Sequence, residues 1–156
     1  MANYFFGEYF NTLDEKGRVA FPSKLKEILN GDIIWITKGM DNDKCLLIYS
    51  PEEWERTVKE IESKINIYTR EARWIYRKFI SPAREIEIDK NGRIAIPQSL
   101  REYAELKRDC VFLGMNKVIE LWDVEIFNNE DKKASEDYIN SFEELGKLSM
   151  RSSKEL

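Results

Sequence analysis

The 156-residue sequence contains no histidine, and it has only two cysteines, four prolines and seven glycines. It therefore lacks the commonest general base, and it also lacks a glycine-rich phosphate loop, a Cys-x-x-Cys pair and a serine in a nucleophile elbow. These absences argue against the common hydrolase, nucleotide-binding and redox chemistries. We expect no enzymatic activity, no cofactor, no metal site and no small-molecule substrate.

Long apolar runs are also absent, because charged residues interrupt every stretch before the roughly 18 to 20 residues that a membrane-spanning helix needs. The opening segment MANYFFGEYF does not have the basic-then-apolar pattern of a secretory leader. Cys45 and Cys110 each lie in an apolar segment, as small reduced core residues would. The sequence predicts a soluble cytoplasmic protein with no membrane partner, and its 42% of apolar residues suffices for one core.

An internal repeat is the main feature that the sequence does contain. DEKGRVAFPSKLKE begins at Asp14 and DKNGRIAIPQSLRE begins at Asp89, and seven shared residue types keep this offset throughout. Each copy extends over about 45 to 50 residues, which is too short for a comfortable core of its own. The two copies are therefore expected to share one core.

The same order of elements is predicted in each copy. Residues 85–89 alternate with the period of a strand and Asn91-Gly92 is a hairpin signal, so a strand, a tight turn and a strand come first. Pro22 and Pro97 suit the start of a short helix, and two apolar strands follow it. The unit is predicted as β-β-α-β-β. The expected divisions are a first repeat (4–50), a helical connector (51–80), a second repeat (81–127) and a C-terminal helix with a tail (128–156).

Helices are predicted outside the repeats. Ser50-Pro51-Glu52-Glu53 has the form of a capping box, which predicts a helix start. Apolar residues at helical spacing then mark three predicted helical faces: Trp54, Val58, Ile61 and Ile65; Ala72, Ile75, Tyr76 and Phe79; and Ala134, Tyr138, Ile139, Phe142, Leu145 and Leu148.

The arginine of each repeat is the first candidate for a binding role. Strand periodicity places Arg18 and Ala20 on one face and the bulky Val19 and Phe21 on the other, and the second copy repeats this around Arg93. The arginines should therefore face outward beside a small alanine, where a guanidinium can contact a phosphate or the edge of guanine.

A structural role for the same residues stays open. Asp14 and Asp89, with Gly17 and Gly92, fit turn formation, and each aspartate can clamp the arginine that follows it. A clamped guanidinium still keeps free N–H groups for DNA. Four lysines near the turns and helix starts could contact phosphates or could simply be solvated: Lys16, Lys24, Lys26 and Lys90.

A basic segment separates the two repeats. Residues 64–84 carry six basic side chains and one acidic side chain, although the net charge of the chain is −4. Arg70, Arg73 and Arg77 share one helical stripe. They could form a second phosphate-binding surface. We favour pairing with acidic residues of the same or a neighbouring chain, which makes the stripe a possible oligomer interface.

Together with GEYFNTLDEKGR near the start and RKFISPAREIEIDKNGR in the middle, the two motif copies resemble the MraZ family, within the wider AbrB/SpoVT group of DNA-binding proteins. The resemblance extends over roughly residues 4–127. It implies an α+β fold in which two pseudo-two-fold-related ββαββ repeats form one β-barrel-like core of the swapped-hairpin AbrB type, with connecting and C-terminal helices. It also implies a ring-shaped homo-oligomer that regulates a division and cell-wall gene cluster through repeated promoter boxes.

These expectations converge on a sequence-specific regulator, a repressor by family resemblance, that binds double-stranded DNA and associates with the nucleoid. Two alternatives remain. One is a ring protein that binds only itself or a protein partner, which the acidic net charge favours. The other is a metal-dependent nuclease, with Asp14-Glu15-Lys16 or Glu85, Glu87 and Asp89 as its site.

Overall fold

The computed structural model describes residues 4–155, with side chains for 4–135 and 137–147. The strands are β1 (Glu8–Thr12), β2 (Arg18–Ala20), β3 (Ile33–Lys38), β4 (Leu46–Tyr49), β5 (Arg84–Glu87), β6 (Arg93–Ala95), β7 (Asp109–Met115) and β8 (Val118–Asp123). The helices are α1 (Ser23–Leu29), α2 (Pro51–Lys64), α3 (Arg70–Ile75), the π-helical turn η1 (Tyr76–Ile80), α4 (Gln98–Tyr103) and α5 (Val124–Glu155). The β-β-α-β-β order predicted for each repeat is therefore confirmed.

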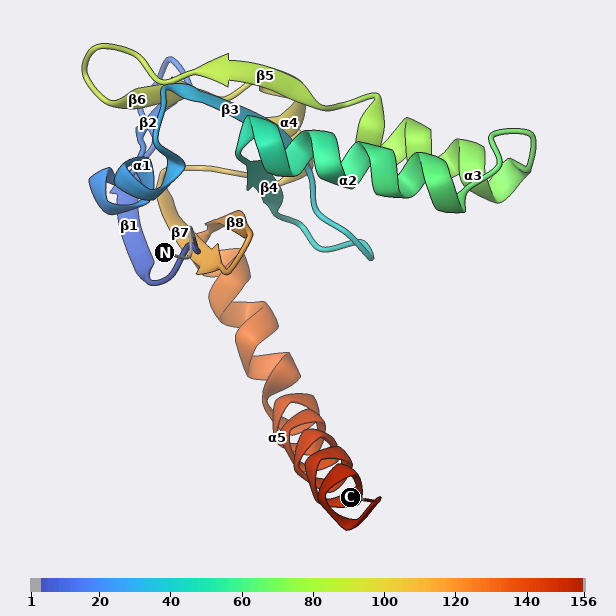
Figure 1. The fold of residues 1–156 in the computed structure, drawn as a ribbon. Helices are drawn as coiled ribbons and strands as arrows, with labels where there is room; N and C mark the ends of the chain where they lie inside the picture. The colour runs from blue at the N-terminus through green and yellow to red at the C-terminus, as the bar shows by residue number, and fades with distance from the viewer. Residues whose placement is uncertain (1–3, 156) are drawn as a thin grey trace. The chain divides into compact units, whose positions relative to one another are not determined.

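Strands of both repeats contribute to one sheet (Figure 1). The six-stranded sheet has the order β1-β7-β8-β4-β3-β5 and all its pairings are antiparallel. The first strand of each repeat pairs with the third strand of the other, as β1 with β7 and β5 with β3. The remaining strands, β2 and β6, form a separate antiparallel pair. Neither repeat can complete its hydrogen bonding alone, so the predicted sharing of one core has a backbone basis.

The main core lies on one face of this sheet. Ile34 and Ile36 of β3 point into it, as do Val19 of β2 and Ile94 of β6, and all four are at most 1% exposed. The short helices α1 and α4 close it with Leu25, Leu29, Leu100 and Ala104. Burying side chains of this kind stabilises the fold by about 1.5 to 3 kcal/mol each. Cys45 and Cys110 are buried and unpaired, as predicted.

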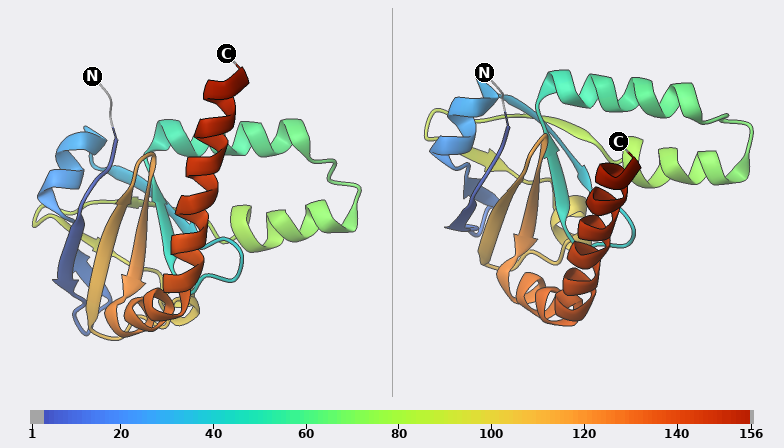
Figure 2. Two further views of the ribbon diagram at one scale, coloured as in Figure 1. Left: turned by 90° about the horizontal axis from the view of Figure 1, so that it is seen from below. Right: turned by 60° about the horizontal axis from the view of Figure 1, so that its bottom comes forward.

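The opposite face of the sheet carries an aromatic cluster. Trp35 of β3 stacks on Trp54 of α2, with ring centroids 5.7 Å apart, and Phe79 of η1 lies 5.4 Å from Trp54. The buried Thr37 hydroxyl donates a 2.5 Å hydrogen bond to the carbonyl of Phe79. These contacts fix the base of the hairpin made by α2 and α3, which extends past the sheet in both views (Figure 2).

Helix starts and ends follow the local signals. Ser50 Oγ accepts the Glu53 N–H at 3.2 Å, which confirms the capping interaction at the start of α2. Asn30 ends α1 in the left-handed conformation, with φ of 55°. Ile75 was expected on the buried face of the second helical segment, but its side chain is 39% exposed. Ile75 borders an open cavity beside Trp74 and Phe79, which leaves its side chain partly accessible.

Helix α5 forms a second structural unit with its own internal contacts. It begins before residue 128, the boundary expected from the sequence, and it reaches Glu155. Its apolar stripe exposes Tyr138, Phe142 and Leu145 by about 60% each. The predicted member Leu148 lies outside the residues whose side chains are described.

The fold class is thus α+β with a mostly antiparallel sheet. The swapped-hairpin, barrel-like assignment stays a prediction. No helix in the described part of the chain is long and apolar enough to cross a membrane.

Candidate nucleic-acid interface

Each repeat motif folds into a turn built around its aspartate. Asp14 Oδ1 accepts the N–H groups of Lys16 and Arg18, both at 2.9 Å, and Gly17 takes a positive φ of 81°. Asp89 Oδ1 accepts the corresponding N–H groups in the second copy at 2.8 and 3.0 Å. A short acceptor side chain at the start and a glycine three residues later are what this turn needs. The repeated spacing of Asp, Gly and Arg therefore has a local structural cause.

The two turns also join each other through the backbone. Phe21 N–H donates to Gly92 O at 2.8 Å, and Ile96 N–H donates to Gly17 O at 2.9 Å. Each glycine thus ends its own turn and anchors the strand of the other repeat. This reciprocal pairing fixes β2 and β6 in register.

The β2–β6 pair presents both arginines on one outward face. Arg18 lies opposite Ala95, and Ala20 lies opposite Arg93. Residues directly opposite in an antiparallel pair share a face. Both alanines are exposed, and the arginine side chains keep exposures of 32% and 31%. The guanidinium groups consequently lie beside small methyl groups that leave them accessible, as the sequence pattern predicted.

Carboxylates hold the arginines in place. Arg18 Nε donates to Asp14 Oδ2 at 3.0 Å, and the same oxygen lies 3.9 Å from Arg93 Nη1. Asp89 Oδ2 lies 3.7 Å from Arg93 Nε, which is buried and has no hydrogen-bond partner. Backbone N–H bonds, led by that of Arg18, lower the pKa of Asp14. The N–H of Arg93 has the same leading effect on the pKa of Asp89. Both turns therefore keep ionised aspartates at neutral pH.

The candidate lysines differ in their surroundings. Lys16 and Lys90 are exposed at the two turns, and Lys24 is exposed in the first turn of α1. Lys26 instead pairs with Asp32 at 3.2 Å. The structure therefore leaves Lys16, Lys24 and Lys90 accessible beside the arginine face, and it gives Lys26 a partner within its own repeat.

Arg101 lies at the first turn, and sequence reasoning did not single it out. Its Nε donates to Ile96 O at 3.0 Å, and a methyl group placed on Gly17 would come within 2.6 Å of its Cζ atom. Arg101 occupies the repeat position of Lys26. An alignment of the two copies shows a basic residue at this position in both, a lysine in the first and an arginine in the second, and this signal could have identified Arg101.

The connector arginines have no acidic partner among the described residues. Arg73 Nη1 donates to the carbonyl of Tyr68 at 3.1 Å, and the Arg77 guanidinium lies 4.9 Å from the centroid of Trp74. Arg70 is exposed at the start of α3. Pairing within the same chain thus receives no support, and pairing with a neighbouring chain stays a prediction.

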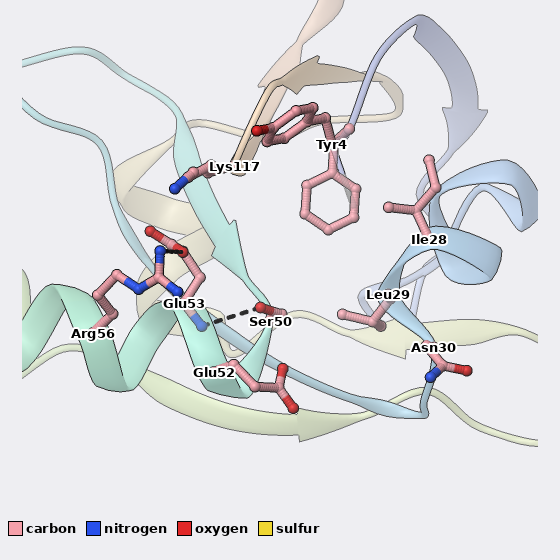
Figure 3. Close-up of a pocket in the computed structure, with 10 residues that line it drawn as sticks. Tyr4, Ile28, Leu29, Asn30, Ser50, Glu52, Glu53, Arg56 and Lys117 are labelled. Atoms are coloured by element: carbon pink, nitrogen blue, oxygen red, sulfur yellow. Dashed lines mark hydrogen bonds and ion pairs between the residues drawn. The ribbon is translucent and has the colours of Figure 1, made fainter. Parts of the chain in front are cut away.

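Two other features were compared with the arginine face. A hollow of about 340 Å³ lies at the start of α2. Figure 3 shows the side chains that line it. Its walls carry Glu52 and Glu53 against Arg56 and Lys117, so its charges largely balance. In the described part of the chain, one group of three possible metal ligands has its donor atoms within 4.8 Å of one another, namely Asp43, Cys45 and Glu120. This group includes neither carboxylate set considered for a nuclease.

The geometry defines a class: a tandem-repeat α+β protein in which interlocked turns display a pair of arginines on one face. Comparison with known proteins places it more narrowly. Residues 4–78 and 79–147 each match the family described as "MraZ protein, putative antitoxin-like". The chain is 44% identical over 142 residues to the protein named "Transcriptional regulator MraZ" of Treponema denticola, covering 91% of this chain and 97% of the relative. The chain belongs to the MraZ family.

One solved structure has a weak likeness to this chain. The solution structure of PHS018 from Pyrococcus horikoshii aligns with 75% of this chain and 87% of its own, with 15% sequence identity and a TM-score of 0.32. A likeness this weak carries no argument about fold or function.

Proposed function

We propose that this protein is a transcriptional regulator that binds double-stranded DNA in a sequence-specific way, with Arg18 and Arg93 as its principal contacts. The observation that carries the proposal is the outward face of β2 and β6, where both arginines are held in antiparallel register opposite exposed alanines. A guanidinium can donate two parallel hydrogen bonds to guanine or to a phosphate. The name of the Treponema denticola relative supports a regulatory role.

The surrounding cations extend this contact surface. Lys16 and Lys90 at the turn tips, with Lys24 at the start of α1, would bind phosphates on either side of the arginines. Phosphate contacts position a protein on the duplex, whereas the arginines would supply the choice of sequence. Arg101 joins the set through its place against the first turn.

Assembly and target follow from the family resemblance. The proposed active form is a ring-shaped homo-oligomer, and each of its chains has a swapped-hairpin core of the AbrB type. This ring would associate with the nucleoid and repress a division and cell-wall gene cluster. Protomers related by rotation face DNA in the same direction, so the operator should consist of direct repeats. One box should bind weakly, and several spaced boxes should gain affinity through effective concentration.

Selection of bound sites from random DNA tests the proposal directly, because it reports binding, sequence and spacing together. Direct repeats are expected, and a selected site made of one inverted repeat would contradict the ring arrangement. Light scattering tests assembly separately. A monomer at working concentrations would count against the ring, and Arg73→Glu should lower the measured mass if the connector stripe lies between chains.

A ring protein without DNA affinity is the second candidate, because Asp14 and Asp89 each lie close to an arginine and partly neutralise the face. A gel shift across a salt series separates the two. Binding that weakens steeply with salt supports the DNA proposal, and its absence at low salt favours the ring protein. Cleavage products after incubation of DNA with Mg²⁺ or Mn²⁺ would instead indicate a nuclease.

A further inference from the structure

A cavity of about 670 Å³ lies between the α2–α3 hairpin and the repeat core, apart from the arginine face. Its walls are mainly apolar: Met40, Ile61, Ile65, Trp74, Phe79 and Tyr103. This volume falls within the range of about 300 to 1,000 Å³ that is typical of small-molecule sites. Because these residues come from the connector helices, the loop after β3 and the helix α4, the cavity exists only in the folded chain.

The rim of this cavity is basic. Lys38 and Lys44 place their ammonium groups 5.1 and 5.3 Å from the centroid of the Tyr103 ring, and Lys78 lies 6.0 Å from that of Trp74. In the part of the chain that the structure describes, these three lysines form no ion pair with a carboxylate. Lys38 and Lys78 line the cavity and Asp41 is the acidic lining side chain, whereas Lys44 and Asp43 lie beside Tyr103 just outside the lining. The lining therefore carries two lysines against one aspartate, over an apolar interior.

In this structure the ammonium groups lie over aromatic rings. A cation over an aromatic ring at an exposed site is held less strongly than a cation in a charge-assisted hydrogen bond. A carboxylate at the opening could attract Lys38 and Lys78 while an attached apolar group displaced water from the interior. A ligand with a cationic head would be repelled by the same lysines.

We infer that this cavity binds a small amphipathic carboxylic acid, with its apolar body between the connector helices and α4 and its carboxylate at the lysine rim. The match in charge, the apolar walls and the concave volume together favour this occupant over a cationic or purely polar ligand. The inference does not depend on DNA binding, because none of the lining residues is proposed to contact DNA.

Calorimetric titration of the full chain with dodecanoate, below its micellar concentration, tests the inference. One bound molecule per chain is expected. Dodecyltrimethylammonium has the same alkyl chain with the opposite charge, and it should bind at least about tenfold more weakly. Equal binding of the two amphiphiles, or no saturable binding of dodecanoate, would overturn the inference.

Variants locate the site. The double variant Lys38→Gln/Lys78→Gln should weaken dodecanoate binding about tenfold and leave the binding of dodecanol, the neutral analogue, within about twofold. Trp74→Ala should weaken both ligands at least about fivefold. Tyr68→Ala is the matched control, because Tyr68 is 87% exposed on the same hairpin and does not line the cavity.

Sedimentation of the same samples distinguishes a competing occupant. If a second copy of the chain covers this cavity, Trp74→Ala will lower the assembly state and wild-type protein will not bind dodecanoate. That pair of results would reject the small-ligand site. Unchanged assembly in Trp74→Ala, together with lost dodecanoate binding, would support it.

Discussion

Replacing Arg18 and Arg93 by alanine should abolish specific DNA binding while leaving the fold intact. Each arginine side chain is about one-third exposed, and Asp14 on the Arg18 side is similarly exposed. Ion pairs at such positions contribute little to stability, so the melting temperature should change by less than about 3 °C. A lost base contact, in contrast, should cost about 1 to 3 kcal/mol of binding free energy, or about 5- to 150-fold in affinity.

The two single variants should not be equal. Arg18 Nε has a hydrogen bond to Asp14, whereas Arg93 Nε is buried without a partner. Removing Arg93 therefore also removes an unsatisfied buried group, and Arg93→Ala should cost less stability than Arg18→Ala. For DNA the first copy should matter more, because Lys16 places a second cation beside Arg18 where the second copy has the neutral Asn91, and Lys90, one position earlier, should compensate only in part.

Fluorescence anisotropy with the selected operator and with scrambled DNA, at several salt concentrations, measures both contributions. Arg18→Lys keeps the charge but loses the forked donor geometry, so it should retain nonspecific binding and lose preference for the operator. Arg56→Ala is the control for simple loss of positive charge, since Arg56 is an exposed arginine on α2. Equal operator affinity of wild type and the Arg18→Ala/Arg93→Ala variant, at unchanged oligomer mass, would refute the assignment.

Three further outcomes test the architecture around this face. Gly17→Ala should lower the free energy of unfolding by about 1 to 2 kcal/mol, because φ is positive there. Gly92→Ala has a similar backbone cost but should cost less in total, because its new methyl group meets no neighbour whereas the one at Gly17 meets the Arg101 side chain. Asp14 should stabilise the fold above its ordinary pKa of 3.8 and lose this effect as acid protonates it, so Asp14→Asn should flatten the fall of melting temperature below about pH 4. Thr37→Val should cost about 1 to 3 kcal/mol in denaturant unfolding, because it leaves the buried Phe79 carbonyl without its donor. For the glycine and threonine variants, an unchanged midpoint of denaturant unfolding would contradict the contact concerned. For Asp14→Asn, an unchanged pH dependence of the melting temperature would do so.

The sequence was sufficient for the order of elements and for the orientation of the arginines. Both rest on local rules: the turn needs Asp and Gly at fixed positions, and strand alternation sends Val19 inward and Arg18 outward. The capping of α2 by Ser50 was predictable for the same reason. Such features depend on neighbours within a few residues, and their signals are therefore visible in the printed sequence.

Long-range contacts were harder to predict from the sequence. The exchange of strands between repeats and the contact of Arg101 with the first turn depend on chain segments many residues apart, and periodicity carries no information about partners. The buried face of the second connector helix was also only partly predicted. Ala72 and Phe79 are buried as expected, but Ile75 borders an open cavity between the connector and the core, and helical periodicity does not reveal such a cavity.

The duplication does more than build the core, because its two copies have diverged in their charged side chains while keeping the same backbone. Both turns use an aspartate to accept two N–H groups, and both glycines accept a hydrogen bond from the other repeat. Yet the first turn is flanked by Arg101, whereas the equivalent Lys26 is paired with Asp32. A rigid, nearly symmetric frame thus carries an asymmetric set of cations. The direct-repeat operator that we propose has a polarity that a symmetric protomer could not distinguish, so this asymmetry would supply the chemical difference that a directional DNA contact requires.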